Sequence, residues 1–189
     1  GIGALYIRRG ILPYNLIDGG GQEGRRRAGT ENVAGIAGIG KALEMATGHL
    51  EEKMAHQREL RDYTINRILK NIPLARLNGS WENRLPGNVN ISFPGLEGET
   101  ILLDLDMHGI CASTGSACNS DSLDPSHVLL AIGRPHEVAH GSLRLSLCED
   151  NSPEEVEYVL REVPRIVEYL RAMSPVWKDL MNGKRKFML

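Results

Sequence analysis

Cys118 is the residue with the clearest capacity for chemistry, because it lies midway along a run of small and polar residues, Ser113–Pro125. Unpaired cysteines are normally among the most buried residues, whereas this run has no apolar period that would bury one. We expect a flexible arm that carries an accessible thiol, and the thiolate form of cysteine is a nucleophile. An ordinary exposed loop cysteine is the alternative.

Regular structure is expected to hold both ends of this arm. An apolar run before it predicts a strand over Ile110–Ser113. After it, Asp124 as N-cap and Pro125 at the first helical position have the form of a helix start. A short helix is expected over Ser126–Ile132. The thiol would therefore be tethered on both sides.

Arg144 is the second candidate, because it lies at the centre of a strictly alternating stretch, Ser142–Leu147. The alternation predicts a strand whose leucines bury one face, which places the arginine on the opposite, polar face. A guanidinium in that position suits bidentate binding of a carboxylate. A solvated strand residue is the alternative.

Thr30 closes a glycine- and arginine-rich stretch, Asp18–Asn32, which leads into a helix predicted over Val33–Met45. Backbone N–H groups, the positive end of the helix dipole and the threonine hydroxyl would all favour an anion at this point. A glycine-rich turn with a solvated basic face is the alternative.

Bulk composition excludes several classes of protein. The chain has 189 residues, 41% of them hydrophobic and 24% charged, with a net charge of −2, which is ordinary for a soluble domain and gives no reason to expect nucleic acid. No apolar window is long enough to span a membrane, and no signal peptide is visible, so we predict a cytoplasmic protein. The three cysteines and six histidines match no metal-ligand spacing.

Periodicity and capping signals predict the other elements. An abrupt start without Met, directly in a strand-like run, indicates a fragment of a longer protein. Strands are predicted over Ala4–Ile7, Ala75–Leu77 and Asn88–Phe93. Helices are predicted over Leu50–Ile72, over Glu99–Met107 and around Trp177. A further long helix should begin at a capping box at Ser152, with a kink or interruption at Pro164.

Taken together, these motifs resemble the NifS/IscS-like cysteine desulfurases, which are pyridoxal-phosphate enzymes. They keep the family's order and are spread over almost the whole chain. The segments that carry the resemblance are Gly1–Tyr6, Gly19–Glu23, Arg27–Asn32, Leu85–Phe93, Gly115–Cys118, Leu123–Leu129, Ala139–Leu147 and Met173–Trp177.

The resemblance implies an α/β protein, the C-terminal part of a pyridoxal-phosphate-dependent transferase of the aspartate-aminotransferase fold (fold type I). Residues 1–48 would be the end of the large cofactor-binding domain. Residues 49–189 would be an α+β small domain that carries the cysteine arm. The enzyme would be a homodimer.

The resemblance also implies the roles of the site residues. Cys118 corresponds to the nucleophile that takes sulfur from L-cysteine and becomes a persulfide, leaving L-alanine. Arg144 corresponds to the arginine that binds the substrate carboxylate, and we add Asn90 as a substrate-binding candidate. Thr30 corresponds to the threonine that reaches the phosphate of pyridoxal 5'-phosphate in the partner subunit. A NifU/IscU-like iron–sulfur scaffold protein, or another sulfur acceptor, would receive the sulfur.

The sequence departs from the family pattern in three ways. No lysine has the family's Ser/Thr-x-His-Lys context, so the Schiff-base lysine is missing and we expect the isolated chain to be inactive. Gly24 and Arg25 stand in exchanged order, and Cys111 and Cys148 replace small residues and are expected to be buried or bystander thiols. A non-catalytic persulfide-relay or scaffold-docking protein, and a selenocysteine or cysteine-sulfinate lyase, are the alternative functions.

Overall fold

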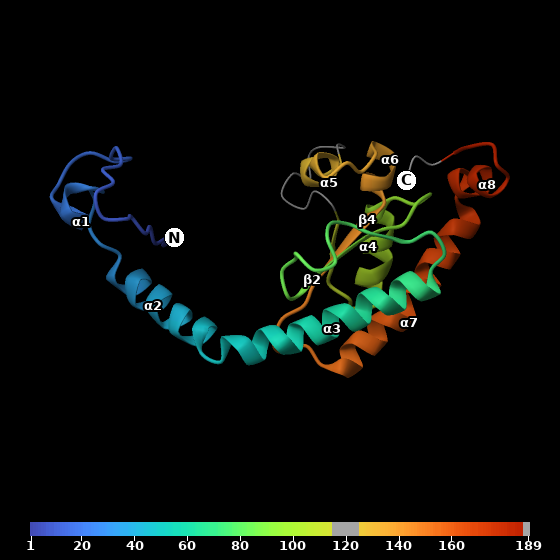
Figure 1. Cartoon of the computed structure of the whole chain (residues 1–189), viewed down its shortest axis with the longest axis horizontal. Helices are drawn as coiled ribbons and strands as arrows, with labels where there is room; N and C mark the ends of the chain where they lie inside the picture. Colours follow the sequence, from blue (N-terminus) through green and yellow to red (C-terminus); the bar gives the residue numbers. More distant parts are fainter. Residues whose placement is uncertain (115–124, 187–189) are drawn as a thin grey trace. The chain divides into compact units, whose positions relative to one another are not determined.

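The computed structural model of the chain describes residues 1–114 and 125–186 (Figure 1). The fold divides into two compact units, Gly1–Leu50 and Glu51–Leu189. Each unit is described by itself below.

The first unit contains a short helix α1 (Gln22–Arg25) and a longer helix α2 (Val33–Thr47). Helix α2 begins where the sequence predicts, because the Asn32 side chain accepts a hydrogen bond from the Gly35 N–H at 3.0 Å and so caps the first turn. The strand predicted over Ala4–Ile7 is wrong: none of the described residues 1–50 forms a strand. A strand needs a partner for its backbone groups, and this unit supplies none.

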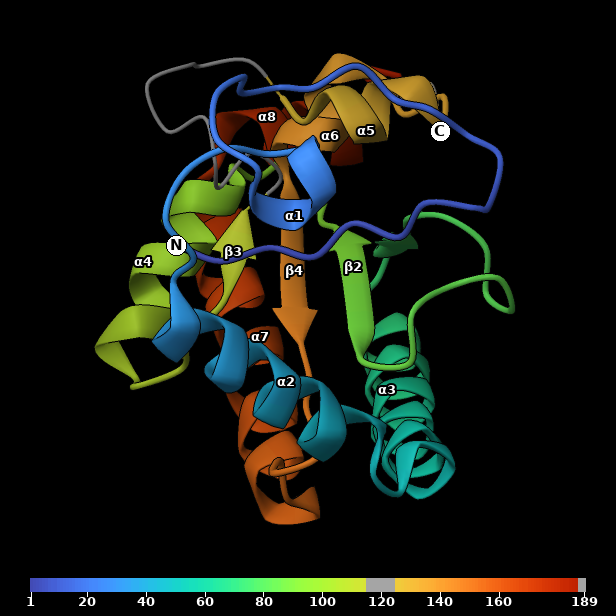
Figure 2. The ribbon, with the colours of Figure 1, turned by 90° about the vertical axis from the view of Figure 1, so that its left-hand side faces the viewer.

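The second unit is built around a four-stranded antiparallel sheet in the order β1-β2-β4-β3. Figure 2 shows β2, β4 and β3 side by side, with α3, α4 and α7 grouped around them. The strands are β1 (Arg76–Leu77), β2 (Asn88–Ser92), β3 (Ser113–Thr114) and β4 (Ser142–Ser146), and the helices are α3 (Leu50–Asn71), α4 (Gly98–Met107), α5 (His127–Ala131), α6 (His136–His140), α7 (Pro153–Met173) and α8 (Pro175–Met181).

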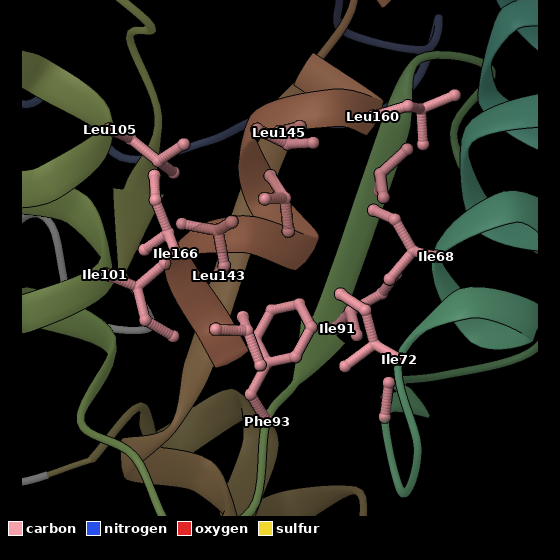
Figure 3. Packing of buried hydrophobic residues seen from close by; sticks show 14 of the residues in the cluster. Ile68, Ile72, Ile91, Phe93, Ile101, Leu105, Leu143, Leu145, Leu160 and Ile166 are labelled. Carbon is pink, nitrogen blue, oxygen red and sulfur yellow. The ribbon is translucent and has the colours of Figure 1, made fainter. Parts of the chain in front are cut away.

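One face of the sheet forms the hydrophobic core with α3, α4 and α7. The alternating residues of the two central strands point into it, as predicted, and Phe93 beside them is fully buried. Figure 3 shows Ile101 and Leu105 of α4 on one side of this layer and Ile68 and Ile72 from the α3 end on the other. The core residues of the strands are Val89, Ile91, Leu143 and Leu145. The opposite face of the sheet is therefore left to the polar residues of the same strands.

Helix α7 begins where its local sequence signal predicts. The predicted capping box opens α7: the Ser152 hydroxyl accepts from the Glu155 N–H at 3.2 Å, and the Glu155 carboxylate accepts from the Ser152 N–H at 3.1 Å. Of the kink or interruption predicted at Pro164, the interruption does not occur, because α7 continues through this residue. Proline removes one helical hydrogen bond, but the neighbouring Val163 and Ile166 are almost fully buried, and their packing favours a continuous helix.

The structure moves both predicted boundaries of the cysteine arm. The strand predicted over Ile110–Ser113 is confined to Ser113–Thr114 in β3, because the Ile110 N–H donates to the Leu105 carbonyl at 3.0 Å and closes α4. Helix α5 begins at His127 with Ser126 as N-cap, and Pro125 precedes it in non-helical backbone. The predicted N-cap Asp124 lies outside the described residues. Within the described ranges, no helix is long and apolar enough to cross a membrane.

Candidate functional site

The polar face of the sheet brings together residues from three strands. Register pairs Arg144 of β4 with Asn90 of β2 on one side and with Ser113 of β3 on the other. Directly paired residues of antiparallel strands share a face, so all three side chains belong to the face away from the core. Arg144 and Asn90, both predicted site residues, are thus neighbours at the centre of the sheet.

Arg144 is half-buried and has donors to spare. Its Nη2 donates a long hydrogen bond of 3.4 Å to the Ser113 hydroxyl. Its Nε is buried and has no hydrogen-bond partner among the described residues. A buried donor that makes no hydrogen bond costs free energy. The guanidinium therefore suits an acceptor from outside the described part of the chain. A carboxylate meets that need with two oxygens.

Asn90 is held in place by a buried amide, Asn78. The Asn78 Nδ2 donates to the Asn90 Oδ1 at 2.7 Å and to the Ser92 hydroxyl at 2.8 Å, and the Asn78 side chain is only 4% exposed. The Arg134 guanidinium donates from Nε to the Asn78 Oδ1 at 2.9 Å and from Nη2 to the Leu77 carbonyl at 2.6 Å. A continuous polar chain therefore runs from the loop between α5 and α6 to the centre of the sheet.

A third arginine, Arg84, lies at the same corner but donates only to backbone carbonyls. It donates to Ser80 at 2.7 Å, to Asn78 at 2.6 Å and to Asn88 at 3.1 Å. Burial, and after it the charge of Arg61, lower the pKa of Arg84 from its usual value. This arginine fixes loop backbone rather than a side chain of the polar face.

The sequence gives no pattern that would have found Ser113, Asn78 or Arg134. Each lies outside a long periodic stretch. Strand pairing brings Ser113 beside Arg144, whereas Asn78 reaches Asn90, and Arg134 reaches Asn78, through side-chain hydrogen bonds. The single available signal was that Ser113 ends an apolar run and opens the small, polar run that contains Cys118.

Thr30 lies in the first unit, exposed, two residues before the N-cap of α2. Of the neighbouring arginines, Arg27 donates from Nη1 to the Ala28 carbonyl at 2.8 Å, and Arg25 and Arg26 are exposed. An exposed hydroxyl close to the N-terminus of a 15-residue helix fits a phosphate. Its role in cofactor binding stays a prediction.

Cys118, the predicted nucleophile, lies outside the described residues. The described chain reaches Thr114 at the end of β3, one residue beyond the partner of Arg144, and resumes at Pro125. Of the other two thiols, Cys111 and Cys148 are both free and exposed, so the option that they are buried is wrong. Cys111 lies close to β3 in the sequence and Cys148 shortly after β4.

A separate cavity of about 530 Å³ opens between the start of α4, helix α6 and the junction of α7 with α8. Neither Arg144 nor Asn90 lines it. The described part of the chain also holds no cluster of three or more metal-ligating side chains. The polar face therefore remains the place where two of the predicted residues, Arg144 and Asn90, meet.

Known proteins match most of this chain. The family model Aminotransferase class-V matches residues 1–159. Identity to cysteine desulfurase IscS of Clostridium botulinum strain Hall is 56% over 188 residues, which is 98% of this chain and 47% of the relative. Identity to cysteine desulfurase IscS of Methanosarcina thermophila is 57% over 176 residues, 93% of this chain and 43% of the relative.

Two solved structures share the fold. A NifS-like protein has a TM-score of 0.75 at 36% identity, covering 87% of this chain and 41% of that one. A NifS-like protein from Rickettsia africae has a TM-score of 0.73 at 31% identity, covering 84% and 41%. The chain thus spans less than half the length of these relatives. The matches confirm the resemblance and the fold class predicted from the sequence.

Proposed function

Because this chain belongs to the class-V aminotransferase family, we propose that it is the C-terminal half of a cysteine desulfurase, which converts L-cysteine into L-alanine and an enzyme persulfide. One observation carries the proposal. Arg144 lies on a polar face between Asn90 and β3, and its buried Nε has no hydrogen-bond partner among residues 1–114 and 125–186. The site for a carboxylate is thus adjacent to β3, the strand that directly precedes the segment with Cys118 in the sequence.

Arg144 and Asn90 would bind the α-carboxylate of L-cysteine and so fix the position of its sulfur. The thiolate of Cys118 would attack that sulfur, forming an S–S bond as the Cβ–S bond breaks. The electron pair of the broken bond stays on the carbon side, where a proton completes L-alanine. An unperturbed thiol has a pKa of about 8.5, so a neighbouring base or positive charge would help to ionise it.

Only part of a pyridoxal-phosphate site fits the residues of this chain. The exposed hydroxyl of Thr30 near the start of α2 fits the phosphate, and we propose that it binds the cofactor of a partner subunit in a homodimer. The covalent lysine has no counterpart in this chain. When bound, the cofactor supplies an electron sink that weakens the Cβ–S bond of the substrate. We further propose a cytoplasmic enzyme that passes its sulfur to an iron–sulfur scaffold protein or another acceptor.

The test is the Cys118→Ser variant of the full-length protein that contains this chain. We expect it to keep the visible absorbance of the cofactor and to bind L-cysteine, but to release no sulfide and to carry no persulfide. Cys111→Ser is the matched control, because Cys111 is also an exposed thiol close to β3, and it should leave sulfide release unchanged. Sulfide release by the Cys118 variant at the wild-type rate would contradict the assignment of the nucleophile.

A further inference from the structure

The polar chain that ends at Asn90 starts from a group that can only donate. A guanidinium carries five N–H donors and no acceptor. The Arg134 Nε lies 2.9 Å from one terminal atom of the Asn78 amide. That atom must therefore be the oxygen, since an NH₂ group there would place two donors against each other. The usual ambiguity of an asparagine amide is removed at this position by the chemistry of its neighbour.

The orientation of Asn78 then fixes the orientation of Asn90. With its oxygen towards Arg134, Asn78 directs its NH₂ group to the Asn90 side chain at 2.7 Å and to the Ser92 hydroxyl at 2.8 Å. The atom of Asn90 that receives this hydrogen bond must be its oxygen. Its NH₂ group is left as a donor, with no hydrogen-bond partner among the described residues.

Burial makes this arrangement rigid. Asn78 is 4% exposed and Ser92 is fully buried, so water does not compete for their hydrogen bonds. Turning the Asn78 amide over would place its NH₂ group against Arg134 and its oxygen against the Asn90 oxygen, which would break the buried hydrogen bonds on both sides. The hydrogen bonds therefore strongly favour one direction, in which Arg134 donates to Asn78 and Asn78 donates to Asn90.

We infer that Arg134 and Asn78 are positioning residues that hold the Asn90 amide with its NH₂ group towards the substrate, where it donates to the carboxylate beside Arg144. The inference rests on the proposed function for the identity of that carboxylate. On this inference, the preference of Asn90 for an anion depends on the orientation of its amide, and that orientation is set by Asn78 and, through it, by Arg134. Neither Arg134 nor Asn78 touches the substrate.

The Asn78→Asp variant of the full-length holoenzyme tests this directly. An aspartate can still accept from Arg134 and from the Ser92 hydroxyl, so the fold is preserved. It can only accept, so Asn90 must turn over and present its oxygen to the site. We expect the Kd for L-alanine, which lacks a thiol and cannot turn over, to rise on the order of tenfold or more in calorimetric titration. The KM for L-cysteine should rise similarly, with kcat changed much less.

A double-mutant cycle separates the effect of reversing the Asn90 amide from the effect of the negative charge that Asn78→Asp adds. Asn90→Ala alone should raise the Kd for L-alanine through loss of its donor. Adding Asn78→Asp to it should produce no further rise, because no amide remains to be turned over. A further tenfold rise in the double variant would mean that the charge acts through space, and it would overturn the inference.

Arg84→Lys is the matched structural control. It keeps the charge but loses the fork that reaches three backbone carbonyls, so the unfolding temperature should fall while the Kd for L-alanine stays at the wild-type value. An unchanged Kd in Asn78→Asp, or wild-type protein that does not bind L-alanine, would refute the inference. Failure of the proposed function is a different result: wild-type protein that binds L-alanine but produces no sulfide from L-cysteine.

Discussion

Gly98, the first residue of α4, packs directly against the start of the strand that carries Arg144. A Cβ atom at this position would lie 2.4 Å from the Ser142 carbonyl oxygen and 3.0 Å from the His140 carbonyl oxygen. Both atoms belong to backbone, which cannot swing aside as a flexible side chain would. We therefore expect Gly98→Ala to displace the start of β4, and with it Arg144 two residues further on.

The net cost follows from two opposing effects. Replacing glycine by alanine in a helix gains up to about 1 kcal/mol in propensity, and less at the first position. Relieving the contact to the Ser142 oxygen needs a shift of about 1 Å, and such overpacking costs about 1–3 kcal/mol. The overpacking should win, so the free energy of unfolding should fall by about 1–2 kcal/mol. For a chain of this length, that lowers the Tm by roughly 2–8 °C.

Thermal and urea unfolding of the two proteins provide the assay, with Thr100→Ala as the matched control. Thr100 is exposed on the same helix, so its replacement by alanine reports helix propensity without a clash and should leave the Tm equal or slightly higher. A Gly98→Ala protein as stable as the wild type would refute the reasoning. It would mean that α4 can move away from β4 at no cost.

Two further outcomes are expected. Arg144→Ala in the full-length protein should raise the KM for L-cysteine by about 10- to 150-fold, the usual value of a hydrogen bond to a charged group, with the Tm little changed; an unchanged KM would mean that Arg144 is only a solvated strand residue. The Asn151 side chain and the Ser152 N–H both donate to the Glu155 carboxylate and lower its pKa below the usual 4.5. The ionised carboxylate therefore stabilises the fold above pH 4.5. This stabilisation is lost as the pH falls through the lowered pKa. Glu155→Ala should therefore lower the Tm at pH 7 and lose its effect in acid, and a Tm difference that persists at the lowest pH would contradict the capping account.

Local signals predicted the elements whose cause is local. The capping box at Ser152 gave the start of α7, and the alternation over Ser142–Leu147 gave β4 within one residue of its observed bounds. Ala4–Ile7 shows the limit of such signals, because an apolar run becomes a strand only when another strand pairs with it. Pro164 shows the opposite case, since the packing of its neighbours in the core prevailed over a local helix breaker.

The candidate site was predictable only in part. Alternation alone placed Arg144 on a polar face, and the register then brought Asn90 beside it. Asn78 and Arg134 were not found, because Asn78 directly follows a two-residue strand and Arg134 lies in a short loop. Their contribution depends on hydrogen bonds between residues 56 positions apart. No periodic pattern within one segment records such a relationship.

The hydrophobic core of the second unit is built from both α3 and α7, which are made at different times during synthesis of the chain. The Arg171 guanidinium in α7 donates to the Pro73 carbonyl just after α3, across 98 residues of sequence, and both helices cover the same face of the sheet. Ribosomes add about 5–20 residues per second, so the apolar stripe of α3 stays uncovered for roughly 5–20 s before α7 has been made. During that time the nascent chain exposes Ile65, Ile68 and the inner face of β2, and we expect it to depend on chaperones until α7 emerges.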